Sequence, residues 1–157
     1  MTKQLNDWLA FIQLPRPELG GLAICPYAKQ AILQKSYDVI NVDIDSIHDI
    51  LENIEFTKND VVILIFDDYE SYDIEYLIDY TKQLNEKYKS NDIVVLDNDP
   101  RDLMIVNGVT TSYEYGYLWI VQSLNDLNKK SSMLQKTNYY SYWSKKQLDE
   151  VVTWRNK

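Results

Sequence analysis

The stretch Val61-Val-Ile-Leu-Ile-Phe66, followed directly by Asp67-Asp68, decides the fold class. An uninterrupted run of valine, isoleucine, leucine and phenylalanine is typical of a strand that is buried on both faces. Two comparable stretches, 37–42 and 93–96, lie before and after it and also end at aspartates. Apolar residues with helical spacing fill the intervals, at 47–54 and 71–89. Strands that alternate with helices predict a mainly parallel sheet with right-handed crossovers.

Further helices are predicted outside this region. Apolar residues at positions 5, 8, 9 and 12 follow the i, i+3, i+4, i+7 pattern, so we expect an amphipathic helix over 2–13 that Pro15 ends. Pro26 stands where a helix-starting proline belongs and predicts a short helix over 27–34. Ser144, with Gln147 three residues later, forms a capping-box pattern that predicts a last helix.

The segment 103–129 carries conflicting signals. Residues 103–106 are typical of a short edge strand before the Asn107-Gly108 turn. Apolar and aromatic residues alternate at 113, 115, 117, 119 and 121, which is a strand pattern, but residues 111–114 form a capping-box pattern. Residues 120, 124 and 127 also keep helical spacing. We predict a helix over 112–129 and attribute the alternation to the abundance of tyrosine, of which the chain has 13.

These patterns predict an α/β fold with a single domain, in which a three- to four-stranded, mainly parallel sheet is flanked by helices. A chain of 157 residues has the usual size of one domain. We expect residues 1–130 to form an acidic α/β body. Residues 131–157 are expected to form a basic, aromatic, helical C-terminal extension that packs on this body or on a second subunit.

The net charge of −8 is unevenly distributed along the chain. From Lys129 onward, seven basic and two acidic residues give a charge of +5, so residues 1–128 carry −13. An acidic body argues against nucleic-acid binding through phosphate neutralisation. The aromatic and basic residues at 139–146 suit stacking on a nucleic-acid single strand, a protein interface or internal packing. We favour internal packing, with the lysines over the body's carboxylates, or its exchange between two subunits of a homodimer.

Composition also bears on location. No apolar run approaches the roughly 20 residues of a membrane span, and the N-terminus has no apolar core of a secretory signal. A single cysteine fits a reducing compartment. We therefore expect a cytoplasmic protein without membrane contact, in a bacterium or in a phage-infected host cell, because its abundant Lys, Ile, Asn and Tyr have AT-rich codons.

The sharpest local motif is Gly21-Leu-Ala-Ile-Cys25-Pro26-Tyr27-Ala28. A thiol at a helix N-terminus lies near the positive end of the helix dipole and near unpaired N–H groups, which stabilise a thiolate or an anionic ligand. Cys25 is therefore a candidate nucleophile, although no general base is identifiable. The alternative is a buried structural cysteine. The candidate ligand-binding residues of this motif are Gly21, Cys25, Tyr27 and Ala28.

Two resemblances begin at this motif. Cys25-Pro26-Tyr27 resembles the start of the glutaredoxin Cys-Pro-Tyr-Cys motif over little more than residues 25–45; because Ala28 replaces the resolving cysteine, it implies only monothiol exchange with glutathione. Trp8-Leu9 together with Gly21-Leu-x-x-Cys-Pro-Tyr-Ala resembles an uncharacterised bacterial family over about residues 5–124. Two histidines and an arginine of that family's pattern stand here as aspartate, tryptophan and glutamine. This second resemblance implies the fold more than a function.

Aspartates follow all three predicted strands. If the strands are parallel, these carboxylates gather at one edge of the sheet, where open α/β sheets bind ligands. Clustered carboxylates suit Mg²⁺, but aspartates are also common helix caps. Arg101 beside them is a candidate ligand for a phosphate or carboxylate, or simply a partner of a neighbouring aspartate. The candidate metal ligands are Asp43, Asp67, Asp97 and Asp99.

The leading hypothesis is a protein that binds a small, anionic ligand at a pocket formed by Cys25 and the start of the helix that follows it, with thiol reactivity as an extension of that role. The first alternative is a phosphoesterase or nucleotide-handling enzyme that uses Mg²⁺ at the acidic strand ends. The second is a non-catalytic interaction protein, of phage origin, whose acidic surface binds a basic protein partner.

Overall fold

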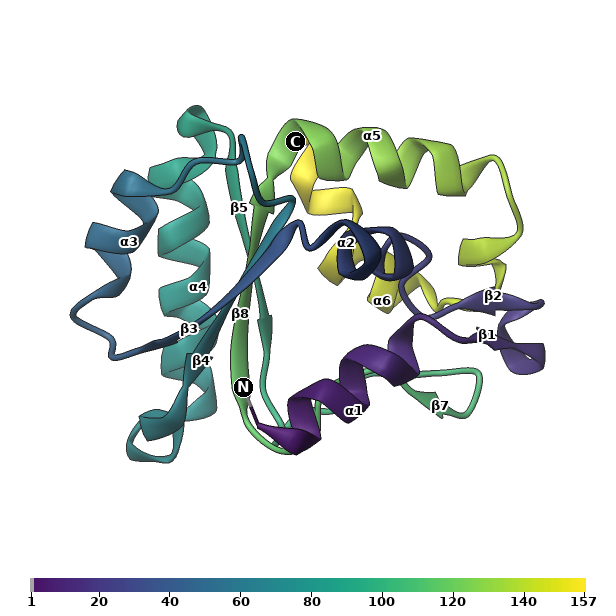
Figure 1. The fold of residues 1–157 in the computed structure, drawn as a ribbon, viewed down its shortest axis with the longest axis horizontal. Helices are drawn as coiled ribbons and strands as arrows, with labels where there is room; N and C mark the ends of the chain where they lie inside the picture. Colours follow the sequence, from purple (N-terminus) through teal and green to yellow (C-terminus); the bar gives the residue numbers. More distant parts are fainter. Residues whose placement is uncertain (1) are drawn as a thin grey trace.

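The computed structural model describes residues 2–157 and places a four-stranded mixed sheet between two layers of helices (Figure 1). The strands follow the order β3-β4-β8-β5. β3 and β4 are parallel, whereas β8 lies antiparallel between β4 and β5. Consequently β3, β4 and β5 run in one direction and β8 in the other. The bounds are β3 Tyr37–Val42, β4 Val61–Phe66, β5 Ile93–Asn98 and β8 Tyr117–Ser123.

Helices cover both faces of this sheet (Figure 1). One layer consists of α3 (Ile47–Asn53) and α4 (Ile74–Tyr88). The other contains α1 (Lys3–Ile12), α2 (Ala28–Gln34), α5 (Leu124–Gln135) and α6 (Lys145–Val151). Two hairpins pair β1 (Pro15–Arg16) with β2 (Leu22–Ala23) and β6 (Ile105–Val106) with β7 (Val109–Thr110). Short 3₁₀ segments occupy Pro17–Leu19, Asp67–Ser71, Lys89–Asn91, Tyr139–Tyr142 and Thr153–Asn156. Within residues 2–157, none of the helices has the length and apolar character that a membrane crossing requires.

Most predicted elements are confirmed. The strands at 37–42 and 61–66 have the predicted bounds, and the helices expected over 47–54 and 71–89 are α3 and α4. The Asn107-Gly108 turn joins β6 to β7. Ser144 and Gln147 form the predicted capping box at the start of α6, because each side chain bonds the other's backbone N–H.

The helix predicted over 112–129 is wrong, and with it the mainly parallel sheet. Residues 117–123 form the central strand β8, which is apolar on both sides: Tyr117, Trp119 and Val121 face α4, while Leu118 and Ile120 face the other helix layer. The alternation of large side chains was therefore a genuine strand signal. The helical spacing belongs to α5, which begins at Leu124 after the N-cap Ser123.

The C-terminal extension contacts the body through aromatic side chains. Tyr139 is buried among Tyr140 and Trp143, and its hydroxyl donates to the carbonyl of Ile24. One cation of the extension pairs locally: Lys146 with Glu150 at 3.6 Å. Within residues 2–157, no ion pair joins the extension to the aspartates at the strand ends, and its exchange between two subunits stays a prediction.

The side chain of Asn85 on α4 closes the free edge of β5. Its Nδ2 donates to the Val95 carbonyl and its Oδ1 accepts from the Val95 N–H, both at 2.8 Å. Asn85 is buried, so no water can replace these bonds easily. The amide thus acts as a substitute for a fifth strand at this position.

We expect Asn85→Ala to lower the free energy of unfolding by about 2 kcal/mol, because it leaves the N–H and C=O of Val95 buried without partners. Urea denaturation measures this change. The exposed Glu86→Ala on the same helix is the control and should change stability by less than about 0.5 kcal/mol. Equal stability of the two variants would contradict the assigned role of Asn85.

Candidate ligand-binding cavity

A cavity of about 500 Å³ lies between the sheet and the second helix layer. Its lining comes from β4, β5 and β8, from the helices α1, α2 and α5, and from the C-terminal extension. Most of these side chains are apolar, among them Ile12, Ile63 and Ile120. Ligand pockets in proteins typically measure about 300–1,000 Å³ and combine an apolar lining with a few polar groups. The cavity therefore has the size and the lining of a small-molecule site.

The two helix layers fill their faces of the sheet unequally, which explains the cavity. On the α4 side, Leu77, Leu84 and Tyr88 pack directly against the strands. On the other side, α2 is only seven residues long and presents the small side chains of Ala28 and Ala31 to the cavity. Methyl groups cannot span the distance between a helix and a sheet, so a space remains beneath α2.

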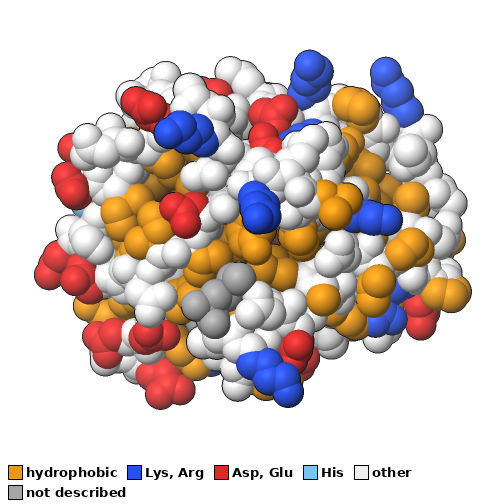
Figure 2. Space-filling model, viewed as in Figure 1, with side chains coloured by type: hydrophobic (Ala, Val, Ile, Leu, Met, Phe, Trp, Pro, Cys, Tyr) orange, Lys and Arg blue, Asp and Glu red, His pale blue; other side chains and the backbone are white. Residues whose placement is uncertain are grey.

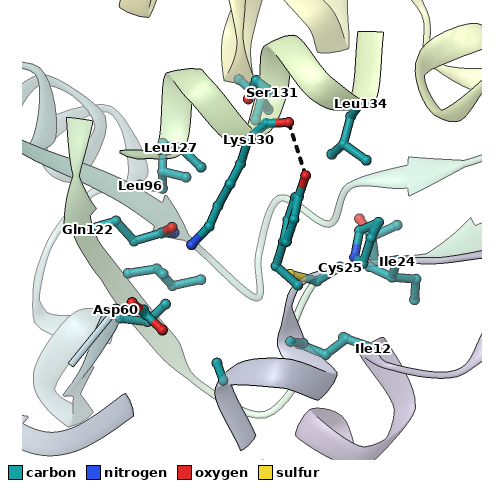
Figure 3. Close-up of a pocket in the computed structure, with 18 of the residues that line it drawn as sticks. Ile12, Ile24, Cys25, Asp60, Leu96, Gln122, Leu127, Lys130, Ser131 and Leu134 are labelled. Atoms are coloured by element: carbon teal, nitrogen blue, oxygen red, sulfur yellow. Dashed lines mark hydrogen bonds between the residues drawn. The ribbon is translucent and has the colours of Figure 1, made fainter. Parts of the chain in front are cut away.

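Cys25 lies in the wall of this cavity together with Tyr27 and Ala28 (Figure 3). Its N–H donates to the carbonyl of Ile12 at 2.9 Å, which fixes the segment against the end of α1. Burial raises the pKa of the Cys25 thiol above its ordinary value, and this effect outweighs the opposing N–H groups of Tyr27 and Ala28. This direction does not favour the thiolate at neutral pH, and the role of Cys25 as a nucleophile stays a prediction.

Lys130 spans the cavity from α5. Its side chain extends toward Gln122 on β8, with Asp60 nearby (Figure 3). Its Nζ pairs with Asp126 at 2.6 Å and lies 5.4 Å from the centre of the Tyr27 ring. The Tyr27 hydroxyl donates to the Lys130 carbonyl at 3.3 Å. The charge of Lys130 is thus already neutralised inside the protein.

Arg155 is the second cation in the lining, and it is 3% exposed. Its Nε donates to the Val151 carbonyl at 2.8 Å and its Nη2 to the Ser131 hydroxyl at 2.9 Å, while Nη1 has no hydrogen-bond partner. No carboxylate among residues 2–157 forms an ion pair with it. Burial lowers the pKa of Arg155, yet a guanidinium stays protonated in proteins. A positive charge without a counter-ion therefore borders the cavity.

The predicted ligand-binding residues fall in different places. Cys25, Tyr27 and Ala28 line the cavity, but Gly21 is exposed in the loop before β2 and does not contribute to the lining. Arg101 also lies elsewhere, because both its Nε and its Nη2 donate to Asp99, at 2.9 and 2.7 Å. In the structure Arg101 therefore pairs with a neighbouring aspartate, which was the alternative to a ligand-binding role.

Gln122, Lys130 and Arg155 are among the polar residues of the cavity that were not predicted. Gln122 had a detectable signal, since it interrupts the apolar row of Leu118 and Ile120 on one side of β8. Lys130 had none, because it follows another lysine on α5. Arg155 had none, because nothing in the short segment Thr153–Asn156 marks its single cation as buried. The role of each depends on contacts with residues of other segments, as between Tyr27 and Lys130 or between Ser131 and Arg155.

The aspartates at the strand ends do not converge on a metal site. Among residues 2–157, no group of three or more His, Cys, Asp or Glu side chains is placed to hold a metal ion. Asp43 accepts from the N–H of Ser46 at 2.8 Å, and Asp99 holds Arg101. β8 also separates β4 from β5, so Asp67, which follows β4, and Asp97, which lies within β5, belong to strands that are not neighbours. The proposed Mg²⁺ site therefore lacks its ligand set.

Comparison of the chain with protein-family models, with curated proteins and with solved structures gives no match.

We expect the Cys25 thiol to react slowly with iodoacetamide at pH 7, with a rate that still rises above pH 9, because a raised pKa keeps the nucleophilic thiolate scarce. The labelling rate across pH, followed by mass spectrometry, measures this. Protein unfolded in guanidinium is the control and should show an ordinary cysteine pKa near ~8.5. Rapid labelling of the folded protein at pH 7 would contradict a raised pKa of the Cys25 thiol.

Proposed function

We propose that this protein binds a small, mainly apolar molecule that carries an anionic group, with a carboxylate as the simplest case, in the cavity lined by Cys25. One observation carries the proposal: Arg155 borders the cavity with a buried guanidinium that lacks both a counter-ion and a partner for Nη1. A buried charge is costly unless it is paired. A ligand carboxylate would supply the missing charge, and the guanidinium fork matches its geometry.

The apolar and uncharged parts of the lining suit the other parts of such a ligand. Ile12, Ile63 and Ile120 offer apolar surface to a hydrocarbon or ring system. Gln122 offers an uncharged amide at the sheet. Cys25 would contact the ligand as a neutral thiol, and the proposal includes no chemical step at the sulfur. The role is thus binding rather than catalysis.

A matched pair of probes tests this function. Decanoate and decanol have the same chain and differ in the head group, so isothermal titration calorimetry of both separates the apolar from the ionic contribution. We expect decanoate to bind more tightly than decanol, and Arg155→Met to weaken decanoate by at least about tenfold while leaving decanol unchanged, since a hydrogen bond to a charged group contributes about 1.5–3 kcal/mol. Equal affinities of the two probes for the unmodified protein would contradict the proposal.

Two further variants serve as controls. Lys136→Met removes an exposed cation of the extension and should leave both affinities unchanged. Ala31→Phe adds a ring beside the cavity and should abolish binding of both probes, because it occupies the space that the ligand needs. Binding that survives Ala31→Phe would place the site outside this cavity. Circular dichroism confirms that each variant is folded.

A further inference from the structure

The cavity contains a second group of polar side chains, which lies against the sheet. Gln122 comes from β8, Asp60 directly precedes β4, and Lys130 reaches across from α5 (Figure 3). Strand pairing brings the first two together, because Gln122 is paired with Val61, the residue after Asp60. We call Gln122, Asp60 and Lys130 the sheet-side polar cluster. Space-filling shows cations on the same half of the molecule as the helices that cover the cavity, so the cluster belongs to the less acidic half (Figure 2).

The polar groups of this cluster are only partly satisfied within the protein. Asp60 accepts the hydroxyl of Ser36 at 2.5 Å, but it forms no ion pair among residues 2–157. Lys130 pairs with Asp126 at 2.6 Å, which occupies one of its three N–H donors. The amide of Gln122 lines the cavity and forms no hydrogen bond with another described residue. Donors and acceptors therefore remain available on the sheet side of the cavity.

The position of Gln122 in its strand also calls for a polar partner. On the same side of β8, Leu118 and Ile120 are apolar, and the residues paired with Gln122 across the sheet are Val61 and Val94. Gln122 is half-buried, and an amide that loses water without gaining a partner is costly. A leucine would complete the apolar row. A polar group of a bound molecule would give the amide its partner.

The mixed charges of the cluster favour an uncharged group as this partner. An ammonium group would be attracted by Asp60 but repelled by Lys130, and a second carboxylate would meet the opposite pair of forces. A hydroxyl has one O–H donor and two acceptor lone pairs, so it can bond to either charge without being repelled by the other. The amide of Gln122 likewise offers both a donor and an acceptor.

We propose that the ligand of this cavity is a hydroxy acid, whose carboxylate binds Arg155, whose hydroxyl binds the sheet-side polar cluster, and whose apolar chain lies between them. This inference rests on the function proposed above. Arg155 is bonded to Ser131, which is adjacent to Lys130 on α5. The four-carbon stem of Lys130 is needed to reach the cluster from there (Figure 3). Several carbon atoms of the ligand must therefore separate its two polar groups.

Hydroxylated forms of one fatty acid test the proposal. Isothermal titration calorimetry compares decanoate with 6-, 8- and 10-hydroxydecanoate, which share the carboxylate and the chain. We expect at least one hydroxy acid to bind about two- to tenfold more tightly than decanoate, the net contribution of one hydrogen bond. Gln122→Leu should reduce that ratio to about one, because it removes the amide and keeps a side chain of similar size. No gain from any hydroxyl, or a gain that survives Gln122→Leu, would overturn the proposal.

Further probes and a control variant test the choice of an uncharged group. 10-Aminodecanoate and decanedioate replace the hydroxyl by an ammonium group and by a second carboxylate. Tighter binding of either than of every hydroxy acid would overturn the assignment of a hydroxyl. Gln135→Leu makes the same substitution at an exposed position of α5 outside the lining, and it should leave the ratio unchanged. Circular dichroism confirms that both variants are folded.

The result can be separated from that of the proposed function. Decanoate that binds no better than decanol contradicts the proposed function, and the hydroxy-acid inference falls with it. Decanoate that keeps its advantage over decanol, without any further gain from a hydroxyl, overturns the hydroxy-acid inference alone.

Discussion

Insertion of β8 between β4 and β5 is the constraint on which the rest of the structure depends. An antiparallel central strand has both faces to cover, and β8 carries large apolar side chains on each. Trp119 is fully buried on the α4 face, where its Nε1 donates to the Thr81 hydroxyl at 2.9 Å. Leu118 and Ile120 face the other layer, which must then be built from α1, α2 and the C-terminal part of the chain. The position of the cavity follows, because that second layer is assembled from short and distant segments and does not close completely.

Local sequence patterns correctly predicted elements whose burial does not depend on which elements lie beside them. The strand at 61–66 is buried on both faces whichever strands lie beside it, so its apolar run was sufficient evidence. β8 also has a continuous apolar sequence, but the following helix begins without an interval at Leu124, and the two patterns overlap. Strand order is a non-local property, because it depends on which strand lies beside which after the chain has closed. The parallel arrangement inferred for the strands at 37–42, 61–66 and 93–96 was therefore right for those three, and wrong for the sheet as a whole.

Part of the cavity lining was also predictable from a local sequence pattern. Cys25, Tyr27 and Ala28 belong to one short motif with a proline at its centre, so the segment stood out. Its chemistry did not follow from the motif, because the degree of burial around the thiol is set by Tyr139 and other residues of the extension. Arg155 could not be recognised as a buried cation from the short 3₁₀ segment Thr153–Asn156, because nothing in that sequence shows what covers it. These groups lie far apart along the chain, so their proximity in the folded protein could not be read from the sequence.

The extension is best understood as part of the cavity wall. Tyr139, Tyr140 and Trp143 line it from one segment and Arg155 from another, so residues after 130 supply both the aromatic cover and the unpaired charge. Replacement of a buried charge by an apolar residue of similar volume is often neutral or stabilising, so stability alone gives little reason for a guanidinium at this position. A role in ligand binding would give such a reason, because the cost of the unpaired charge would be offset only when an anion occupies the cavity. The basic character of the extension then has two separate origins: exposed lysines on its surface, and a single buried arginine that borders the cavity.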